Sequence, residues 1–312
     1  MVPAWISNKY NLAALLIALA LDYAYPRHRG LSLAVHPVHT SFLLARRLAP
    51  PYSSALRGAL AWLAVMASHL AVAASLLYAA WRILGAPGWV VAAALVYKHS
   101  ISLRLLLQHS ARTASLLGSG RLGEARLEVS NIVRRDTSSL SGGHVASAAI
   151  ESVAESLVDG FTSPLLYAAL LGPLGALAQR VANTLDGALG FKTPEYINAG
   201  RLSAYADTVL NWIPARLTGL LIALAAPLAG GSVSGALHAM ARWGASTESR
   251  NAGYPMASMA GALGVCLEKP GSYRLNPQAP CPGPGDVYRA NRVAIAAAAL
   301  TLLLVAALAA AV

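Results

Sequence analysis

The chain has 312 residues, of which 56% are hydrophobic and only 12% are charged, and its formal net charge is +11. An average soluble domain has about 25% charged residues, and a disordered chain combines few hydrophobic residues with many charges. The composition therefore excludes both classes and predicts a polytopic integral membrane protein. The apolar runs consist mainly of Ala and Leu rather than alternating Val, Ile and Thr, so we expect an all-α fold with a polar region of loops and helices that carries the carboxylates.

The predicted membrane segments are stretches without Asp, Glu, Lys or Arg, because a helix needs about 20 apolar residues to cross the hydrocarbon layer. The first stretch, 10–21, reaches that length only when it is extended to residues 5 and 25. It runs into Asp22 instead of a small-residue cleavage site, so we expect a retained anchor. The later stretches are 58–81, 83–97, 160–179, 217–241 and 293–312.

Charge and turn residues predict the topology and the domain organisation. Basic residues cluster in the loops 27–47 and 112–135, which should face the cytoplasm of a multi-pass cell-membrane protein. Anionic lipid accounts for the positive charge, so we expect the bilayer as a partner and no nucleic acid. Breaks at Pro173 and Gly230 predict interrupted or re-entrant segments. We expect one membrane-embedded domain, 1–312, with a cytoplasmic helical insertion at 104–160 and a Pro/Gly-rich polar loop region at 242–289.

Acidic residues are concentrated in one part of the chain, because seven of the thirteen lie between 136 and 207. In a helix over 144–159 that ends at Gly160, Glu151, Glu155 and Asp159 form one stripe at i, i+4 and i+8. Like charges at this spacing destabilise a helix by about 0.2 to 0.5 kcal/mol per pair, so a bound cation or a row of Arg residues should compensate. The alternative is a solvated helix face, although the opposite face is apolar and suited to docking on a bundle.

Two further polar pairs follow. Asn183 and Asp186 lie one turn apart, and oxygen ligands of this kind suit a hard divalent cation such as Mg²⁺. Asp207 and Asn211 are spaced i, i+4 shortly before Arg216. For both pairs, helix capping or a satisfied contact inside the bundle remains an alternative.

Several other motifs carry little weight. The GSGRLG segment at 118–123 follows a helical stretch rather than a strand, so a dinucleotide site is improbable, and no Walker loop exists. His36 and His39 of the HPVH segment lack a third metal ligand, which favours a loop near a substrate. Cys266 and Cys281 have no zinc-ligand pattern, and a disulfide between them stays open.

Six blocks in order resemble the CobD/CbiB family of cobalamin biosynthesis, the adenosylcobinamide-phosphate synthases. The blocks are HPV at 36–38, ARLEVSNIVRRDT at 125–137, AAIESVAESLVDGFTSPLLY at 148–167, NTLDGALGFKTPEY at 183–196, DTVLNWIPARLT at 207–218 and NAGYPMASMAGALGVCLEKPGSY at 251–273. The resemblance implies amide ligation of (R)-1-aminopropan-2-ol, or its O-phosphate, to a propionate carboxylate of the corrinoid adenosylcobyric acid. It also implies ATP and Mg²⁺, and other membrane enzymes of the pathway as partners.

With that reaction in view, site residues can be assigned, because a carboxylate must be activated before an amine attacks it and the phosphates involved need cations and Mg²⁺. The expected catalytic residues are Glu151, Glu155, Asp207 and Arg216, and the expected metal ligands are Glu151, Asp159 and Asp186. The expected substrate- and phosphate-binding residues are His36, Arg135, Asn183, Lys192, Arg201, Asn211, Asn251, Tyr254 and Lys269.

Two readings from other classes remain. Intramembrane acids together with helices interrupted by Pro and Gly also describe a secondary transporter, although no convincing internal repeat connects the two halves of the chain. A membrane-embedded scaffold without chemistry is the third reading. Product formation in detergent, without a membrane gradient, would favour the ligase.

Overall fold

The computed structural model describes residues 8–311 and confirms the all-α, polytopic membrane class. Within those residues, four helices are long and apolar enough to cross a membrane. The chain divides into two compact units, each built from separated stretches of sequence. The first unit contains the chain up to Ser102, Ser163–Leu210 and the residues from Val305, and the second contains Leu103–Thr162 and Asn211–Leu304. The expected organisation, one membrane-embedded domain with a cytoplasmic helical insertion, stays a prediction.

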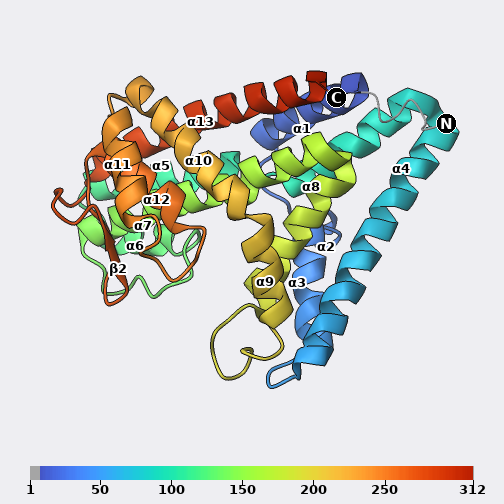
Figure 1. Cartoon of the computed structure of the whole chain (residues 1–312), viewed down its shortest axis with the longest axis horizontal. Coiled ribbons are helices and arrows are strands. Elements are labelled where there is room, and N and C mark those ends of the chain that lie inside the picture. The colour runs from blue at the N-terminus through green and yellow to red at the C-terminus, as the bar shows by residue number, and fades with distance from the viewer. Residues whose placement is uncertain (1–7, 312) are drawn as a thin grey trace. The chain divides into compact units, whose positions relative to one another are not determined.

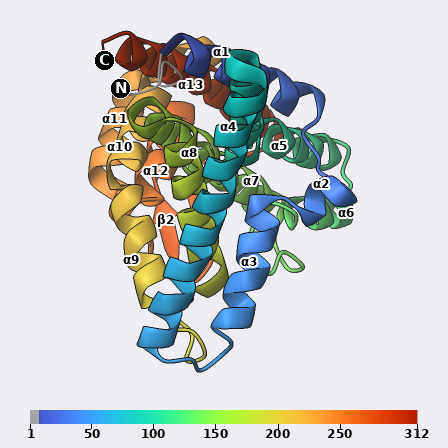
Figure 2. The ribbon, with the colours of Figure 1, turned by 90° about the vertical axis from the view of Figure 1, so that its right-hand side faces the viewer.

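The first unit is a helical bundle whose core consists mainly of Ala, Val and Leu. Its helices are α1 (Asn8–Ala24), α2 (Leu31–Ala34), α3 (Pro37–Leu48), α4 (Ala55–Ser100), α8 (Ser163–Leu189) and α9 (Arg201–Leu210). Figure 1 and Figure 2 both show α3 beside the first arm of α4, and the small residues Ala45 and Ala61 are buried in the core there. Residues before position 8, into which the first apolar stretch was extended, lie outside the described part.

Helix α4 folds back on itself, so the predicted stretches 58–81 and 83–97 form its two arms (Figure 1). The reversal occurs at Gly85, whose φ of 63° and ψ of −148° belong to a region that is open essentially only to glycine. Pro87 follows within the second arm. A Cβ atom on Gly88 would lie 2.6 Å from the carbonyl oxygen of Ala80, so the tight approach of the two arms also requires glycine there.

Helix α8 is interrupted at a glycine in the same way as α4. Gly172 has φ of 66° and ψ of −156°, Pro173 follows it, and a Cβ on Gly175 would lie 2.4 Å from the carbonyl oxygen of Tyr167. The predicted segment 160–179 is therefore interrupted, as Pro173 indicated. Both reversals place glycine at the turn and again three residues later.

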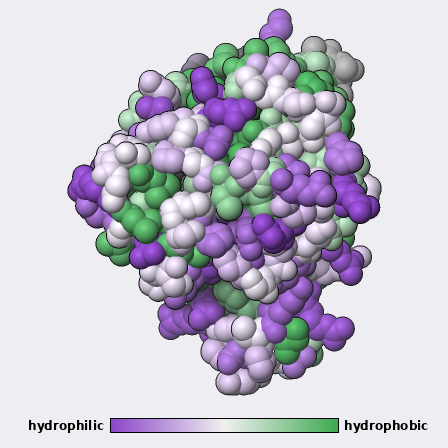
Figure 3. Space-filling model, turned by 90° about the vertical axis from the view of Figure 1, so that its left-hand side faces the viewer, coloured by the Kyte–Doolittle hydropathy of each residue, from purple (hydrophilic) through white to green (hydrophobic). Residues whose placement is uncertain are grey.

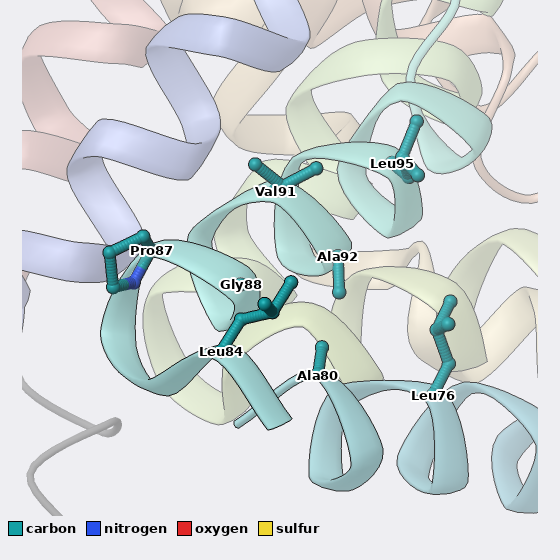
Figure 4. A pocket seen from close by; sticks show the side chains of 8 residues that line it. All are labelled: Leu76, Ala80, Leu84, Pro87, Gly88, Val91, Ala92 and Leu95. Carbon is teal, nitrogen blue, oxygen red and sulfur yellow. The ribbon is translucent and has the colours of Figure 1, made fainter. Parts of the chain in front are cut away.

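The angle between the arms of α4 holds a pocket of about 430 Å³ (Figure 4). Leu76 and Ala80 of the first arm and Val91, Ala92 and Leu95 of the second line it, with other apolar residues at the turn. Because all the described residues that line this pocket are apolar, it suits hydrocarbon and not a phosphate or a carboxylate.

The second unit combines helices with one small sheet. Its elements are α5 (Arg104–Gly118), α6 (Leu122–Val129), α7 (Gly142–Leu157), the π-helix η2 (Val158–Thr162), α10 (Trp212–Ala225), the 3₁₀-helix η3 (Ala226–Ala229), α11 (Val233–Trp243), α12 (Gly253–Leu263), β1 (Leu267–Lys269), β2 (Tyr273–Leu275) and most of α13 (Pro284–Ala311). Helix α12 packs against α7, α10 and α11. Hydrophilic side chains are spread over the face drawn in Figure 3, with hydrophobic ones between them.

The acidic helix differs from the prediction at its end. It begins where Ser141 accepts a hydrogen bond from the backbone N–H of His144, and it does not stop at Gly160. Instead, one turn of π-helix carries the chain directly into α8. Since a π-turn inserts an extra residue, it shifts Asp159 relative to the stripe expected from a regular helix. The opposite apolar face is buried, as expected.

Two further segments were only partly anticipated. The stretch 217–241 is interrupted as Gly230 indicated, because α10 ends in η3 and Gly230 adopts a left-handed conformation before α11 begins. The region 242–289, expected to be a polar loop, contains the largely buried helix α12 and the antiparallel pair β1 and β2. Pro270 and Gly271, with φ of 75° at the glycine, form the turn between these strands.

Candidate functional site

Glu151 lies at the centre of a buried polar cluster in the second unit, although it carries a charge. Its Oε1 accepts a hydrogen bond from the hydroxyl of Ser147 at 2.5 Å, one turn earlier on α7. Its Oε2 accepts from Arg135 Nη1 at 3.1 Å and from the hydroxyl of Tyr273 on β2 at 2.7 Å. Only 5% of Glu151 is exposed, so the alternative of a solvated helix face does not hold for this residue.

The small sheet is what completes this cluster. The backbone N–H of Glu268 donates to Ser147 Oγ at 2.7 Å and so fixes β1 against α7. The pairing of Lys269 with Tyr273 then sets the register in which the Tyr273 hydroxyl reaches Glu151. Burial, followed by the negative charge of Glu151, raises the pKa of Tyr273 far above its usual range. Tyr273 therefore stays a neutral hydrogen-bond donor.

Arg135 has binding capacity beyond its ion pair. Its Nε and Nη2 atoms are buried and have no hydrogen-bond partner among residues 8–311. Buried N–H groups are rarely left without an acceptor in proteins, and guanidinium groups match the geometry of phosphate and carboxylate oxygens. The two N–H groups are thus suited to an anionic ligand.

The other two acids of the expected stripe lie in different surroundings. Glu155 is exposed, while Asp159 is half-buried within the π-helix that follows α7. Among the described residues, Glu151, Glu155 and Asp159 do not form a group of three ligands within metal-binding reach of one another. A magnesium ion there would need ligands from water and from a substrate phosphate, which is the usual situation for Mg²⁺.

Arg216 is the centre of a second polar cluster in this unit, which includes the expected site residues Asn251 and Tyr254. Its guanidinium carbon lies 4.0 Å from the ring centroid of Trp212 and 4.0 Å from that of Tyr254, so the cation is held between two aromatic rings. Arg216 Nη1 also donates to the side-chain oxygen of Asn251 at 3.3 Å and to the backbone oxygen of Trp212 at 2.7 Å. Arg216, Asn251 and Tyr254 were all expected from the sequence to be site residues, and the fold brings all three together.

The remaining expected residues of the second unit lie elsewhere in it. Asn211 is buried at the start of α10, where its side chain makes no capping hydrogen bond. Lys269 is partly exposed on β1, and its ammonium nitrogen lies 3.9 Å from a carboxylate oxygen of Glu248. That pair is long and exposed, so it holds Lys269 only weakly.

In the first unit, the structure brings together two blocks that are far apart in sequence. Asn183 Nδ2 on α8 donates to Asp207 Oδ1 on α9 at 3.1 Å. Asp186, one turn after Asn183, packs over Gly190, where a Cβ atom would lie only 1.9 Å from Asp186 Oδ1. Glycine at position 190 is therefore required by the position of the Asp186 carboxylate. Lys192 and Arg201 are exposed near these residues in sequence.

His36 has neighbours that the sequence did not indicate. Its ring lies 4.4 Å from that of His28 and 4.8 Å from that of His99, measured between centroids, and His39 is not part of this group. Desolvation is the main cause that lowers the pKa of His28 to about 4 and that of His36 to about 3, so both rings are neutral at pH 7. His28 and His99 have no local spacing to His36 that a sequence motif could detect.

The site residues fall into both units, with Glu151, Glu155, Asp159 and Arg216 in the second and Asp186, Asn183, Asp207 and His36 in the first. The expected magnesium site that combines Glu151, Asp159 and Asp186 stays a prediction. Cys266 and Cys281 are both free thiols. Ser147, Trp212 and Tyr273 were not expected from the sequence, although Tyr273 is the last residue of the sixth sequence block.

Comparison with known proteins gives a consistent result. The sequence model of a family described as CobD/Cbib protein matches residues 15–304. A probable cobalamin biosynthesis protein CobD from Aeropyrum pernix is 52% identical over 294 residues, which cover 94% of this chain and 92% of the relative. The cobalamin biosynthesis protein CobD of Rhodobacter capsulatus is 38% identical, with 89% and 91% covered. No solved structure matches the chain.

Proposed function

The chain belongs to the CobD/CbiB family of cobalamin biosynthesis proteins, and on that premise we propose that it is a membrane-bound, ATP-dependent acid–amine ligase. It joins the amine of (R)-1-aminopropan-2-ol, or of its O-phosphate, to a propionate carboxylate of adenosylcobyric acid. In this reaction a C–N bond forms, and one carboxylate oxygen leaves with a phosphoryl or adenylyl group that comes from ATP. The amine loses a proton to a base.

The observation that carries the proposal is Arg135 with its two buried N–H groups that lack an acceptor among residues 8–311. A ligase of this class must bind several anionic oxygens, from the nucleotide, the amino-alcohol phosphate and the carboxylate. Arg135 is held in place by Glu151, and we propose that its Nε and Nη2 bind one of these anions. Glu151 then acts as a positioning residue, because its oxygens already accept three hydrogen bonds.

Arg216 supports the proposal as a second cation with a fixed plane. A guanidinium held between two rings loses little side-chain entropy when it binds an anion, since its orientation is already set. The neighbouring rings of Trp212 and Tyr254 also provide an apolar wall beside the charge, which suits a large ligand with both apolar and polar edges.

The carboxylates divide between a metal role and a base role. Mg²⁺ bound to ATP would neutralise phosphate charge and hold the transferred group, and Asp186 is the residue that we assign to it, with water and phosphate oxygens as the other ligands. Glu155 is exposed and lies one turn after Glu151 on α7, so we assign it as the base that accepts the amine proton. Asn183 lies one turn before Asp186 on α8. Its hydrogen bond to Asp207 on α9 fixes the orientation of both side chains.

We place the enzyme in the cell membrane with its site on the cytoplasmic side, where ATP is available. The supporting observations are the four apolar helices and the concentration of Arg residues in the loops 27–47 and 112–135. Large apolar side chains are exposed along α4 and α13, including Leu60, Ile83 and Leu303, as expected of a lipid-facing surface.

The experiment that tests the proposal uses the full chain purified in detergent, with adenosylcobyric acid, Mg²⁺, ATP and either the amino alcohol or its phosphate. Chromatography with mass detection should show an amide product that depends on ATP. Because detergent micelles carry no gradient, product under these conditions is incompatible with a protein that only transports. Absence of product with both amines would overturn the proposal.

A secondary transporter is the second candidate, and the paired reversals favour it. Gly85 in α4 and Gly172 in α8 interrupt two apolar helices in the same way, and interrupted helices are typical of transporters. Uptake of labelled cobyric acid into proteoliposomes, driven by an imposed proton or sodium gradient and without ATP, would support this candidate. The ligase proposal expects no gradient-dependent uptake.

A further inference from the structure

Three histidines meet in the first unit from three separate elements. His28 lies in the connection between α1 and α2, His36 is the residue before the first turn of α3, and His99 is in the last turn of α4. The ring of His28 lies 5.2 Å from that of His99 between centroids, in addition to the distances already given. Each side chain offers one nitrogen, and these three nitrogens all lie within 4.8 Å of one another.

The hydrogen bonds of the rings leave nitrogens available. Both nitrogens of His28 are buried and have no hydrogen-bond partner in the described part of the chain. His99 Nδ1 lies 2.7 Å from the backbone oxygen of Leu95, so Nδ1 carries the proton and Nε2 keeps its lone pair. A histidine whose other ring nitrogen donates to a backbone carbonyl is the usual arrangement of a metal ligand.

His36 must change its hydrogen bonding before it can bind a metal ion, unlike His28 and His99. Its Nδ1 accepts a hydrogen bond of 3.2 Å from the backbone N–H of Val38, which places the ring proton on Nε2 in the metal-free state. Ligation by either nitrogen therefore requires that this long hydrogen bond be given up. A coordinate bond to a transition metal outweighs one long hydrogen bond of this kind.

Charges of both signs lie near the three histidines. Lys98, next to His99, forms a buried ion pair of 3.1 Å with Asp22, so its charge is compensated. Arg180 on α8 lies near enough to His36 to affect it electrostatically. The positive charges of Lys98 and Arg180 oppose a further positive charge, whereas the carboxylate of Asp22 favours it.

We propose that His28, His36 and His99 form a binding site for a divalent transition-metal ion of the zinc class. Three imidazole ligands with a fourth position left for water or another ligand are typical of zinc sites that are not purely structural. A tetrahedral ion with Zn–N bonds of about 2.0 Å places its ligand nitrogens about 3.3 Å apart. The ligand nitrogens, which lie within 4.8 Å of one another, therefore move closer by up to about 1.5 Å when the ion binds, which rotation about the side-chain torsions allows.

The inference does not rest on the proposed ligase function, because it is tested by metal binding alone, and His36 is the only one of its three residues that was also expected to bind substrate. No ligation substrate is needed for the measurement. A ligase without this metal site and a metal-binding protein without ligase activity would give different results in the two experiments.

The test uses the full chain without a polyhistidine tag, purified in detergent and stripped with a chelator. Titration with Zn²⁺ in the presence of a competing chelator should give one ion per chain. Substitution by Co²⁺ should give the visible absorption bands of a tetrahedral site. His28→Gln and His99→Gln should each weaken binding by at least about tenfold.

His39→Gln is the matched control, since it removes the other histidine of the HPVH segment and leaves the cluster complete; its affinity should equal that of the wild type. Elution on size exclusion and thermal unfolding show whether each variant is folded. If His99→Gln is misfolded, His28→Gln decides, because His28 lies in a connection and not in a helix. No binding by the wild type, or equal binding by all variants, would overturn the inference.

Discussion

The guanidinium of Arg135 donates a hydrogen bond to the buried carboxylate of Glu151 at 3.1 Å. The side chains of both residues are largely inaccessible to water, and a buried charge is tolerated only when it is paired and hydrogen-bonded. Glu151 is saturated by Ser147, Arg135 and Tyr273, whereas Arg135 retains two N–H groups without an acceptor within residues 8–311. The pair is thus neutral as a whole and incomplete on one side, which is the side that a substrate anion can complete.

Glu151→Gln should abolish ligation, with a loss of at least about 100-fold, while the protein still inserts into the membrane. The amide keeps the shape of the side chain but removes the charge that orients Arg135, and breaking a buried pair costs about 3 to 5 kcal/mol. The measurement is the initial rate of amide formation at saturating substrates. Glu124→Gln, in an exposed pair with Arg121, is the matched control and should keep the wild-type rate.

Asp186→Asn should also abolish ligation, because it removes a carboxylate assigned to Mg²⁺. Gly190→Ala provides an independent version of this test, since its Cβ would lie 1.9 Å from Asp186 Oδ1 and must displace that carboxylate without altering its charge. Both variants should raise the Mg²⁺ concentration needed for half-maximal rate or eliminate activity. Gly123→Ala, where a Cβ meets nothing within 4 Å, should have no effect. Wild-type rates and an unchanged Mg²⁺ dependence in both Asp186→Asn and Gly190→Ala would remove the metal role.

Arg216→Lys should raise KM for the anionic substrate by about tenfold or more and leave the fold intact. Lysine keeps the positive charge but cannot stack as a planar group between Trp212 and Tyr254, and each cation–π contact at a partly exposed site contributes about 0.5 to 1 kcal/mol. Steady-state kinetics with ATP and with the amine varied separately would show which substrate is affected. An unchanged KM for every substrate would contradict a role of Arg216 in anion binding.

Gly85→Ala and Gly172→Ala should each destabilise the protein by about 1 to 3 kcal/mol, because alanine rarely adopts the backbone conformation of these two turns. Lower yield in the membrane and a lower temperature of unfolding in detergent are the expected observations. Gly283→Ala, at a position with negative φ and open space, is the comparison. Equal stability of all three variants would show that the reversals do not depend on glycine.

The sequence predicted the class of the fold because a membrane-spanning helix needs about 20 consecutive apolar residues, and such stretches are visible in the local composition. Stretches without charge at 58–81 and 83–97 correspond to the two arms of α4, and Pro173 and Gly230 marked real interruptions. The end of the acidic helix could not be read in the same way, because a single π-turn replaces the stop that Gly160 suggested. The pair β1 and β2 was missed because three-residue strands carry no periodic signal, although Pro270 and Gly271 are typical of a turn.

The candidate site was predicted in part for a related reason. Arg216, Asn251 and Tyr254 were named from blocks of sequence, and the fold places them in contact. The burial of Glu151 depends on a partner more than a hundred residues away, Tyr273, so no spacing along α7 could reveal it. The histidine cluster was missed for the same reason, since His28 and His99 approach His36 only in the folded bundle.

The central claim, that this chain activates a carboxylate and converts it into an amide, is tested most directly by following oxygen. Adenosylcobyric acid labelled with ¹⁸O in its free propionate carboxylate is incubated with the purified chain, Mg²⁺, ATP and the amine, and all products are analysed by mass spectrometry. The account predicts an amide product together with one labelled oxygen in phosphate or in AMP. Unchanged corrinoid, or an amide whose displaced oxygen appears in neither, would contradict it.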